Sequence, residues 1–160
     1  MFDEVLGLPA HPLIIHFAVV LTPLLVAVAL AYTLMARRRQ LLAWAVVLLS
    51  LAAPVAVFAA KESGESLKAT RFGSVDAAIG ARISTHQSFA NPLLLSTLGL
   101  AVAALLLVYA TSPSRNSIGS DRFGRPVTLA LSAVTVLLAL AAGYYVFRAG
   151  DSGARAVWGV

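Results

Sequence analysis

The chain has no cysteine among its 160 residues. Disulfide bonds, thiolate-bound metals and cysteine-ligated iron–sulfur clusters are therefore excluded. Any metal bound by this protein has to take histidine, carboxylate or other oxygen ligands.

Charged residues are also scarce. Only 12% of the residues are charged, whereas 59% are hydrophobic. So little polar surface does not suit a water-soluble protein, and the chain needs a lipid bilayer around it. The formal net charge of +5 does not indicate nucleic-acid binding. The excess arginines fall in the loops on one side of the membrane, where they suit anionic lipid headgroups.

Four long runs of the sequence carry no formal charge. Each has the roughly 20 residues that a helix needs to cross about 30 Å of hydrocarbon. Each is apolar on every face, which excludes the alternation of a membrane strand. The predicted fold class is all-α integral membrane, a four-transmembrane-helix bundle that forms a single domain over residues 1–160. The predicted spans are about 12–36, 41–60, 87–110 and 127–147, with inner loops 37–40 and 111–126 and an outer loop 61–86.

The outer loop contains a helical pattern of its own. Val75, Ile79 and Ile83 recur at every fourth position. Ser74 lies just before this pattern and Asp76 lies within it, and both side chains favour a helix start. We therefore expect a short amphipathic helix before the third span.

The arginines determine the predicted orientation. Arg37, Arg38 and Arg39 follow the first span directly, in a loop too short to place them elsewhere. The positive-inside rule assigns this loop to the cytoplasm. Both chain ends and the outer loop are then expected on the outside.

All three histidines fall at the outer ends of predicted spans, because His11 and His16 open the first span and His86 precedes the third. Titratable side chains are costly at membrane depth, so this convergence indicates a ligand site or a proton path. Five residues of separation place the rings of His11 and His16 about 140° apart on a helix, so the two cannot chelate one ion. We expect His16 to be the buried partner of His86. His11 is expected to cap the helix, shuttle protons or contact the polar edge of a ligand.

The sequence also resembles a known family. The carrying features are the start His11-Pro12-x-x-x-His16-Phe17, the four spans, the histidine before the third span and the ending Gly150-Asp151-Ser152-Gly153-Ala154-x-x-Val157-Trp158-Gly159. They are similar to the bacterial family called domain of unknown function twenty-two thirty-one. The resemblance covers essentially the whole chain and implies a multi-pass protein of the bacterial inner membrane. Ala18 stands where the family pattern has proline, and Asp151 where histidine is often seen. Some members are fused or adjacent to cytochrome-type modules, which implies a redox setting.

The main functional hypothesis is a single haem b held between His16 and His86, for electron transfer or as a redox accessory module. Bis-histidine ligation needs imidazoles on facing helices, small residues beside the porphyrin and basic groups for its propionates. The candidates for small residues are Ala60, Ala90 and Gly143, and those for the propionates are Arg82, Arg148 and Arg155.

Two other hypotheses stand beside haem binding. One is a copper, zinc or nickel site built from His11, His16 and His86 with Glu62 or Glu65. The other is an accessory subunit of a respiratory or transport complex in which the histidines are only interfacial.

The sequence gives little support to an enzyme function. Ser63 and Ser66 lie near acidic residues, but no nucleophile elbow surrounds them. The tail after Arg148 contains Gly150 and Gly153, which would allow it to fold across the mouth of the bundle as a lid or to lie as a short anchored tail.

Overall fold

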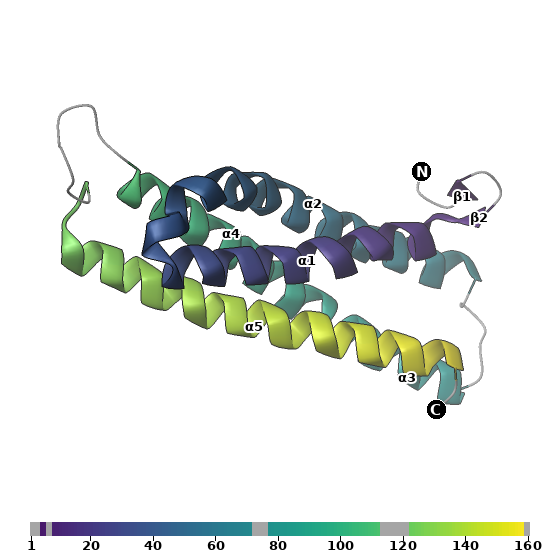
Figure 1. Ribbon diagram of the computed structural model, residues 1–160. Helices are drawn as coiled ribbons and strands as arrows, with labels where there is room; N and C mark the ends of the chain where they lie inside the picture. Colours follow the sequence, from purple (N-terminus) through teal and green to yellow (C-terminus); the bar gives the residue numbers. More distant parts are fainter. Residues whose placement is uncertain (1–3, 6–7, 72–76, 113–121, 159–160) are drawn as a thin grey trace.

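The computed structural model describes residues 4–5, 8–71, 77–112 and 122–158 (Figure 1). Two short strands, β1 (Glu4–Val5) and β2 (Leu8–Pro9), form an antiparallel pair in which Glu4 lies opposite Pro9. The rest of the described chain is helical apart from short connections. The helices are α1 (Ala10–Leu34), the 3-10 turn η1 (Ala36–Arg38), α2 (Arg39–Arg71), α3 (Ala77–Ser88), α4 (Ala90–Thr111) and α5 (Arg125–Trp158).

Four helical segments of the described chain are long and apolar enough to cross a membrane, namely His11–Leu34, Ala36–Thr70, Ile79–Thr111 and Arg125–Ala156. The predicted all-α membrane fold with four spans is therefore confirmed. The short helix predicted before the third span is present as α3. Its predicted start at Ser74 to Asp76 lies outside the described residues.

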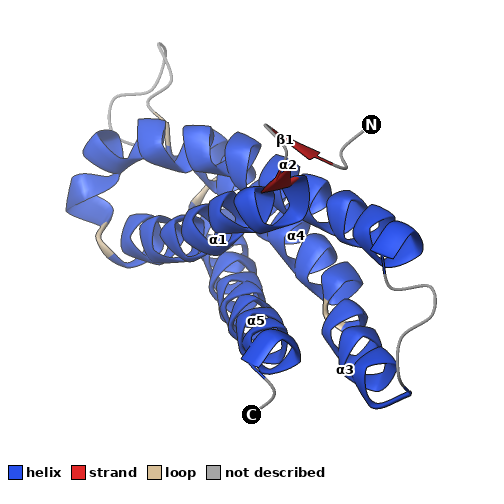
Figure 2. Ribbon diagram, turned by 90° about the vertical axis from the view of Figure 1, so that its right-hand side faces the viewer, coloured by secondary structure: helices blue, strands red, loops and turns tan. Residues whose placement is uncertain are grey.

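The four long helices form a closed ring. Helix α1 packs against α2 and α5, and α4 packs against the same two helices, so α1 and α4 lie diagonally across the bundle (Figure 2). The start of α1, the end of α2, helix α3 and the end of α5 share one end, at the right of Figure 1. We call it the histidine end, and the opposite end, which carries Arg37 to Arg39, the arginine end.

The helices continue well beyond the predicted spans. Most of the predicted outer loop 61–86 is helical, since α2 extends to Arg71 and α3 fills the second half. Helix α5 likewise continues to Trp158, so of the two alternatives for the tail, the lid folded across the mouth of the bundle is not found. Hydropathy reports the hydrocarbon-crossing part of a helix, whereas backbone hydrogen bonds can propagate into the polar segments. Ion pairs one turn apart support these extensions, Lys61 with Glu65 at 2.9 Å and Arg155 with Asp151 at 3.0 Å.

The boundary between α3 and α4 follows from a proline. Pro92 has no N–H with which to bond the carbonyl of Ser88, and α3 ends at that residue. The chain turns at Phe89, whose N–H donates to the carbonyl of His86 at 3.2 Å. His86 is therefore held in the last turn of α3, directly above the membrane-spanning helix α4.

Small and hydroxyl-bearing residues share the interior with a few larger apolar residues such as Leu25 and Leu100, while most large apolar residues cover the outside. Ala53, Ala139, Ala142, Thr22 and Thr97 are fully buried. The exposed set includes Phe17, Leu41, Trp44, Leu95, Leu137 and Phe147. Small side chains let membrane helices approach closely, and a large apolar exterior suits lipid contact. The bundle has a tight interior and a surface made for hydrocarbon.

Candidate functional site

His11 is held at the histidine end by the last part of α2. Its Nδ1 lies 2.9 Å from Oγ of Ser63, and the half-buried imidazole also interacts with the carbonyl of Ala60. The hydroxyl of Ser63 donates its own proton to the Ala60 carbonyl at 3.0 Å. With its proton donated in this way, the hydroxyl accepts from the ring, which favours the tautomer of His11 with the proton on Nδ1. In that tautomer Nε2 of His11 keeps its lone pair.

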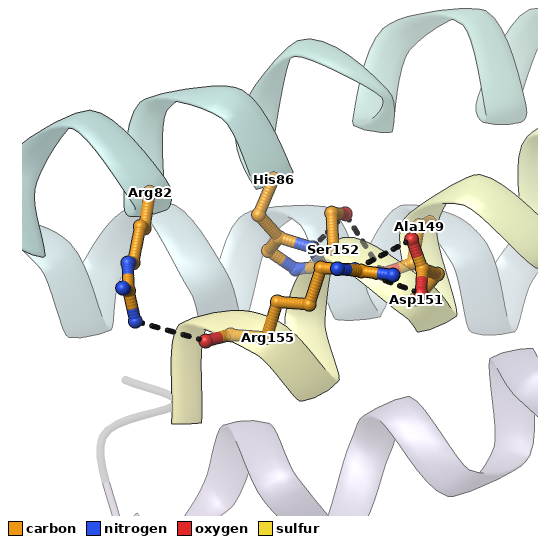
Figure 3. Close-up of polar contacts among 6 residues, drawn as sticks. All are labelled: Arg82, His86, Ala149, Asp151, Ser152 and Arg155. Atoms are coloured by element: carbon orange, nitrogen blue, oxygen red, sulfur yellow. Dashed lines mark hydrogen bonds and ion pairs between the residues drawn. The ribbon is translucent and has the colours of Figure 1, made fainter. Parts of the chain in front are cut away.

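His86 is held in the same way by α5 (Figure 3). Its Nδ1 lies 3.1 Å from Oγ of Ser152, and the ring also interacts with the carbonyl of Ala149. Ser152 donates its hydroxyl proton to that carbonyl at 3.1 Å. The arrangement therefore favours the same tautomer for His86, with the proton on Nδ1 and the lone pair on Nε2.

A glycine follows each of these serines and makes room for the imidazole. A Cβ atom on Gly64 would lie 3.0 Å from Cε1 of His11. A Cβ atom on Gly153 would lie 3.1 Å from Cε1 of His86. Both distances are shorter than ordinary carbon–carbon contacts, so an alanine at either position would require the ring to move by a few tenths of an ångström.

The two anchored imidazoles belong to one site. Both lie at the histidine end of the bundle, His11 in the first turn of α1 and His86 in the last turn of α3. They come from opposite sides of the helix bundle, since His11 lies in α1 and His86 lies in α3, just before α4. His11 is bonded to α2, the helix that follows α1, and His86 is bonded to α5, the helix that follows α4. Within the described residues, no group of three or more His, Asp or Glu side chains forms a metal site. The arrangement offers two ring nitrogens as ligands.

His16 does not take part in this pair. Its side chain is exposed, and Nδ1 bonds the carbonyl of Pro12 in its own helix. The structure does not bring the predicted pair of His16 and His86 together; His11, and not His16, lies on the inward face of α1. Helix α1 turns the stripe containing Ala18 and Thr22 toward the core, and His11 continues that stripe at seven residues before Ala18. The five-residue spacing then places His16 on another face.

The same geometry separates the three histidines expected for the copper, zinc or nickel site. Its predicted carboxylates are engaged elsewhere, because Lys61 pairs with Glu62 at 3.4 Å and with Glu65 at 2.9 Å.

The three candidate arginines lie on the His86 side of the site. Arg82 donates to the carbonyl of Arg155 at 3.4 Å, and Arg155 pairs with both carboxylate oxygens of Asp151 at 3.0 and 3.1 Å (Figure 3). Arg148 lies over the ring of Phe89, 5.1 Å from its centroid. Arg82 and Arg148 are exposed at this end of the bundle.

The three predicted small residues occupy different places. Ala60 and Ala90 are half-buried near the histidine end, and Ala60 interacts with His11 directly. Gly143 lies deeper, where an added Cβ would be 3.8 Å from Val26 of α1. Gly143 therefore serves helix packing.

Residues 7–160 match the family described as predicted membrane protein (DUF2231). The chain belongs to this family. The resemblance in the terminal motifs is thereby confirmed, and no curated protein or solved structure matches the chain. For this DUF2231 protein the family description supplies a membrane location, so the chemistry has to be argued from the side chains.

The serines and glycines that hold the imidazoles were not among the predicted site residues. Their signal is a repeated pentapeptide, Ala60-Lys61-Glu62-Ser63-Gly64 in α2 and Ala149-Gly150-Asp151-Ser152-Gly153 in α5. Both copies have the form Ala-x-acidic-Ser-Gly at the outer part of a long helix. Ser63 is 1% exposed, and its hydroxyl donates to the Ala60 carbonyl of its own helix. A buried serine that does not donate to the histidine does not resemble a hydrolase pair.

Proposed function

We propose that this DUF2231 protein binds one haem b at the histidine end, where His11 and His86 would hold its iron, and acts as a membrane redox module. The single observation that carries the proposal is the pair of imidazoles anchored through Nδ1. Iron is bound by a neutral imidazole nitrogen, and a second ring nitrogen that donates to a fixed acceptor orients the ligand. Both histidines meet this requirement through Ser63 and Ser152.

The surroundings fit a haem in three respects. Ala60, Gly64 and Gly153 keep bulk away from the two rings. Arg82 and Arg148 supply positive charge at the polar end, where propionates would meet water. The bound group would supply one-electron chemistry, and the residues of this chain hold its ligands and limit access of water. One such site at one end of the bundle can exchange electrons at that face only.

The proposed location in the membrane rests on the four candidate spans and on the arginines of the turn between α1 and α2. The protein is a membrane protein with four candidate spans. We propose that it lies in the bacterial inner membrane with the histidine end outside. Arg37 and Arg38 are exposed in the turn between α1 and α2, as expected for a cytoplasmic positively charged loop.

The test is a visible absorption spectrum of the full-length protein, purified in detergent after expression with ample haem. A Soret band with reduced α and β bands after dithionite is expected. The bands should be lost or shifted in His11→Ala and in His86→Ala and retained in His16→Ala. His16 is a matched control, because it is a histidine of the same helix as His11 but is exposed on another face.

Each outcome decides between the hypotheses. Absence of haem bands in the wild-type protein, or their survival in both His11→Ala and His86→Ala, would contradict the proposal. Elemental analysis of the same samples tests the metal hypothesis, since stoichiometric copper, zinc or nickel lost in those two variants would indicate an ion bound by two imidazoles. Neither haem nor metal, together with co-purifying membrane subunits, would favour the accessory-subunit hypothesis.

A further inference from the structure

The first helix of each hairpin has the same pattern of buried positions when counted from its histidine. In α1 the buried positions after His11 include Ala18, Thr22, Leu25, Ala29 and Tyr32. After His86 the corresponding positions in α4 are Leu93, Thr97, Leu100, Ala104 and Leu107, and all of them are buried. The spacings from the histidine are identical. Each histidine therefore marks the same level on the inward face of its helix.

The second helices repeat each other in the same manner. Counted back from Ser63, the inward positions of α2 are Ala60, Val57, Ala53, Ser50 and Val46. Counted back from Ser152, the same positions of α5 are Ala149, Val146, Ala142, Ala139 and Thr135. The first member of each set is half-buried and the others are buried. The pentapeptides that hold the imidazoles are thus part of a longer structural repeat.

The helix contacts have the matching symmetry. Exchange of α1 with α4 and of α2 with α5 converts each hairpin into the other, and it converts the α2–α4 contact into the α5–α1 contact. Both hairpins start and finish at the histidine end. Repeats that run in the same direction are related by an approximate two-fold axis along the bundle, which in a membrane is the direction of the bilayer normal. The axis relates His11 to His86 and Ser63 to Ser152.

We propose that the protein is a duplicated two-helix module in which Ser63 and Ser152 are equivalent positioning residues, one per module, that hold His11 and His86 in the Nδ1–H tautomer so that both offer Nε2 to one ligand on the axis. The ligand in this statement rests on the proposed function. The tautomer and the equivalence of the two serines are properties of the protein without a ligand.

Serine is suited to this role because its hydroxyl is already committed. Each serine donates to the carbonyl three residues earlier, at 3.0 Å for Ser63 and 3.1 Å for Ser152. A committed hydroxyl presents a lone pair to the ring, and the adjacent alanine carbonyl can only accept. The tautomer of a histidine is determined by the hydrogen bond that its other nitrogen makes. Two identical anchors produce two identical ligand nitrogens.

The test of the tautomer uses the ligand-free, full-length protein labelled with 15N-histidine in lipid nanodiscs. Protonated and unprotonated ring nitrogens differ strongly in 15N chemical shift, and the three histidines are assigned with single His→Gln variants. We expect Nδ1 protonated and Nε2 unprotonated in both His11 and His86. Ser63→Ala should change the nitrogen shifts of His11 alone and Ser152→Ala those of His86 alone. Ser63→Thr and Ser152→Thr, which keep the hydroxyl, should restore the wild-type shifts.

A serine outside the pentapeptides provides the control. Ser88 is exposed, lies two residues after His86 and donates to the carbonyl of Thr85 at 2.7 Å. Ser88→Ala should leave the ring nitrogens of His86 unchanged. Protonation at Nε2 in the wild-type protein, or unchanged shifts in both Ser63→Ala and Ser152→Ala, would overturn the inference whether or not haem binds.

A second measurement tests equivalence in the loaded protein. Loss of an outer hydrogen bond to a metal-binding histidine typically lowers affinity by about 10–100-fold. Ser63→Ala and Ser152→Ala should each weaken haem binding by about this factor and shift the midpoint potential in the same direction. Opposite shifts, or an effect in only one variant, would contradict the duplicated site. A protein that binds no haem but has the expected tautomers would contradict the proposed function and leave the positioning role intact.

Discussion

The substitution Gly64→Ala separates the stability of the bundle from the geometry of the site. The added methyl group would lie 3.0 Å from Cε1 of His11, where carbon atoms normally approach to about 3.5–4.0 Å. The ring has to move by a few tenths of an ångström to relieve this contact. The hydrogen bond from His11 to Ser63 is 2.9 Å long, and a displacement of that size along it would bring it to the usual limit of about 3.2 Å for such bonds.

The helix itself should respond in the opposite direction. Gly64 lies inside α2, and alanine is favoured over glycine inside a helix by about 1 kcal/mol. The melting temperature of Gly64→Ala in detergent should therefore stay at or above that of the wild-type protein. Haem affinity should fall, and the 15N shifts of His11 should change. A variant that loses the site without losing stability cannot have lost it through unfolding.

Other glycines of the chain serve as controls. An alanine Cβ at Gly80 or Gly150 would meet nothing within 4 Å, so these two substitutions should leave the site unchanged. Gly153→Ala should reproduce the effect of Gly64→Ala at His86, because its Cβ would lie 3.1 Å from Cε1 of that ring. Wild-type haem affinity and unchanged 15N shifts in both Gly64→Ala and Gly153→Ala would refute the close-contact reasoning.

Further predictions concern orientation and the bundle interior. Because the chain has no cysteine, a single introduced cysteine reports the side of the membrane on which it lies. An impermeant maleimide should label Ala69→Cys in spheroplasts, but Gln40→Cys only after permeabilisation. The reverse pattern would invert the proposed orientation. Within the described part of the chain, the buried hydroxyl of Thr22 has no hydrogen-bond partner. Thr22→Val should therefore leave the free energy of unfolding unchanged or raise it by up to about 1 kcal/mol, as measured in a thermal melt. A clear loss of stability would indicate a bound water or ligand at this hydroxyl. Tyr32→Phe should lower stability by about 1 kcal/mol in a thermal melt, because the buried Tyr32 hydroxyl lies 2.7 Å from Oγ1 of Thr111; an unchanged melt would show that this bond contributes nothing.

Hydropathy predicts the membrane-crossing part of each helix but not its full length. The apolar runs predict where the chain crosses hydrocarbon, and each of them is helical in the structure. They do not report that α2 continues to Arg71 or α5 to Trp158, since a polar segment carries no hydrophobic period to read. These extensions bring Ser63 and Ser152 to the histidines. A site at the end of a bundle is therefore built by residues that a span prediction assigns to loops.

The histidines show the corresponding limit for the site. Sequence spacing separates His11 from His16 by angle, and this separation holds in the structure. It does not say which of the two faces inward. The rotation of α1 about its axis depends on how Thr22, Leu25 and Ala29 pack against the neighbouring helices, which is a property of the whole bundle.

The sequence by itself determined that this protein is a four-span helical membrane protein without thiol chemistry and with its histidines at one end. Lipid requires every backbone hydrogen bond to be made within a helix, so composition and run length suffice for that conclusion. Only the tertiary structure decided that His11 and His86 form the pair, that Ser63 and Ser152 hold them, and that two hairpins repeat one arrangement. These facts depend on helix rotation and on contacts between distant segments, and side-chain packing in three dimensions determines both.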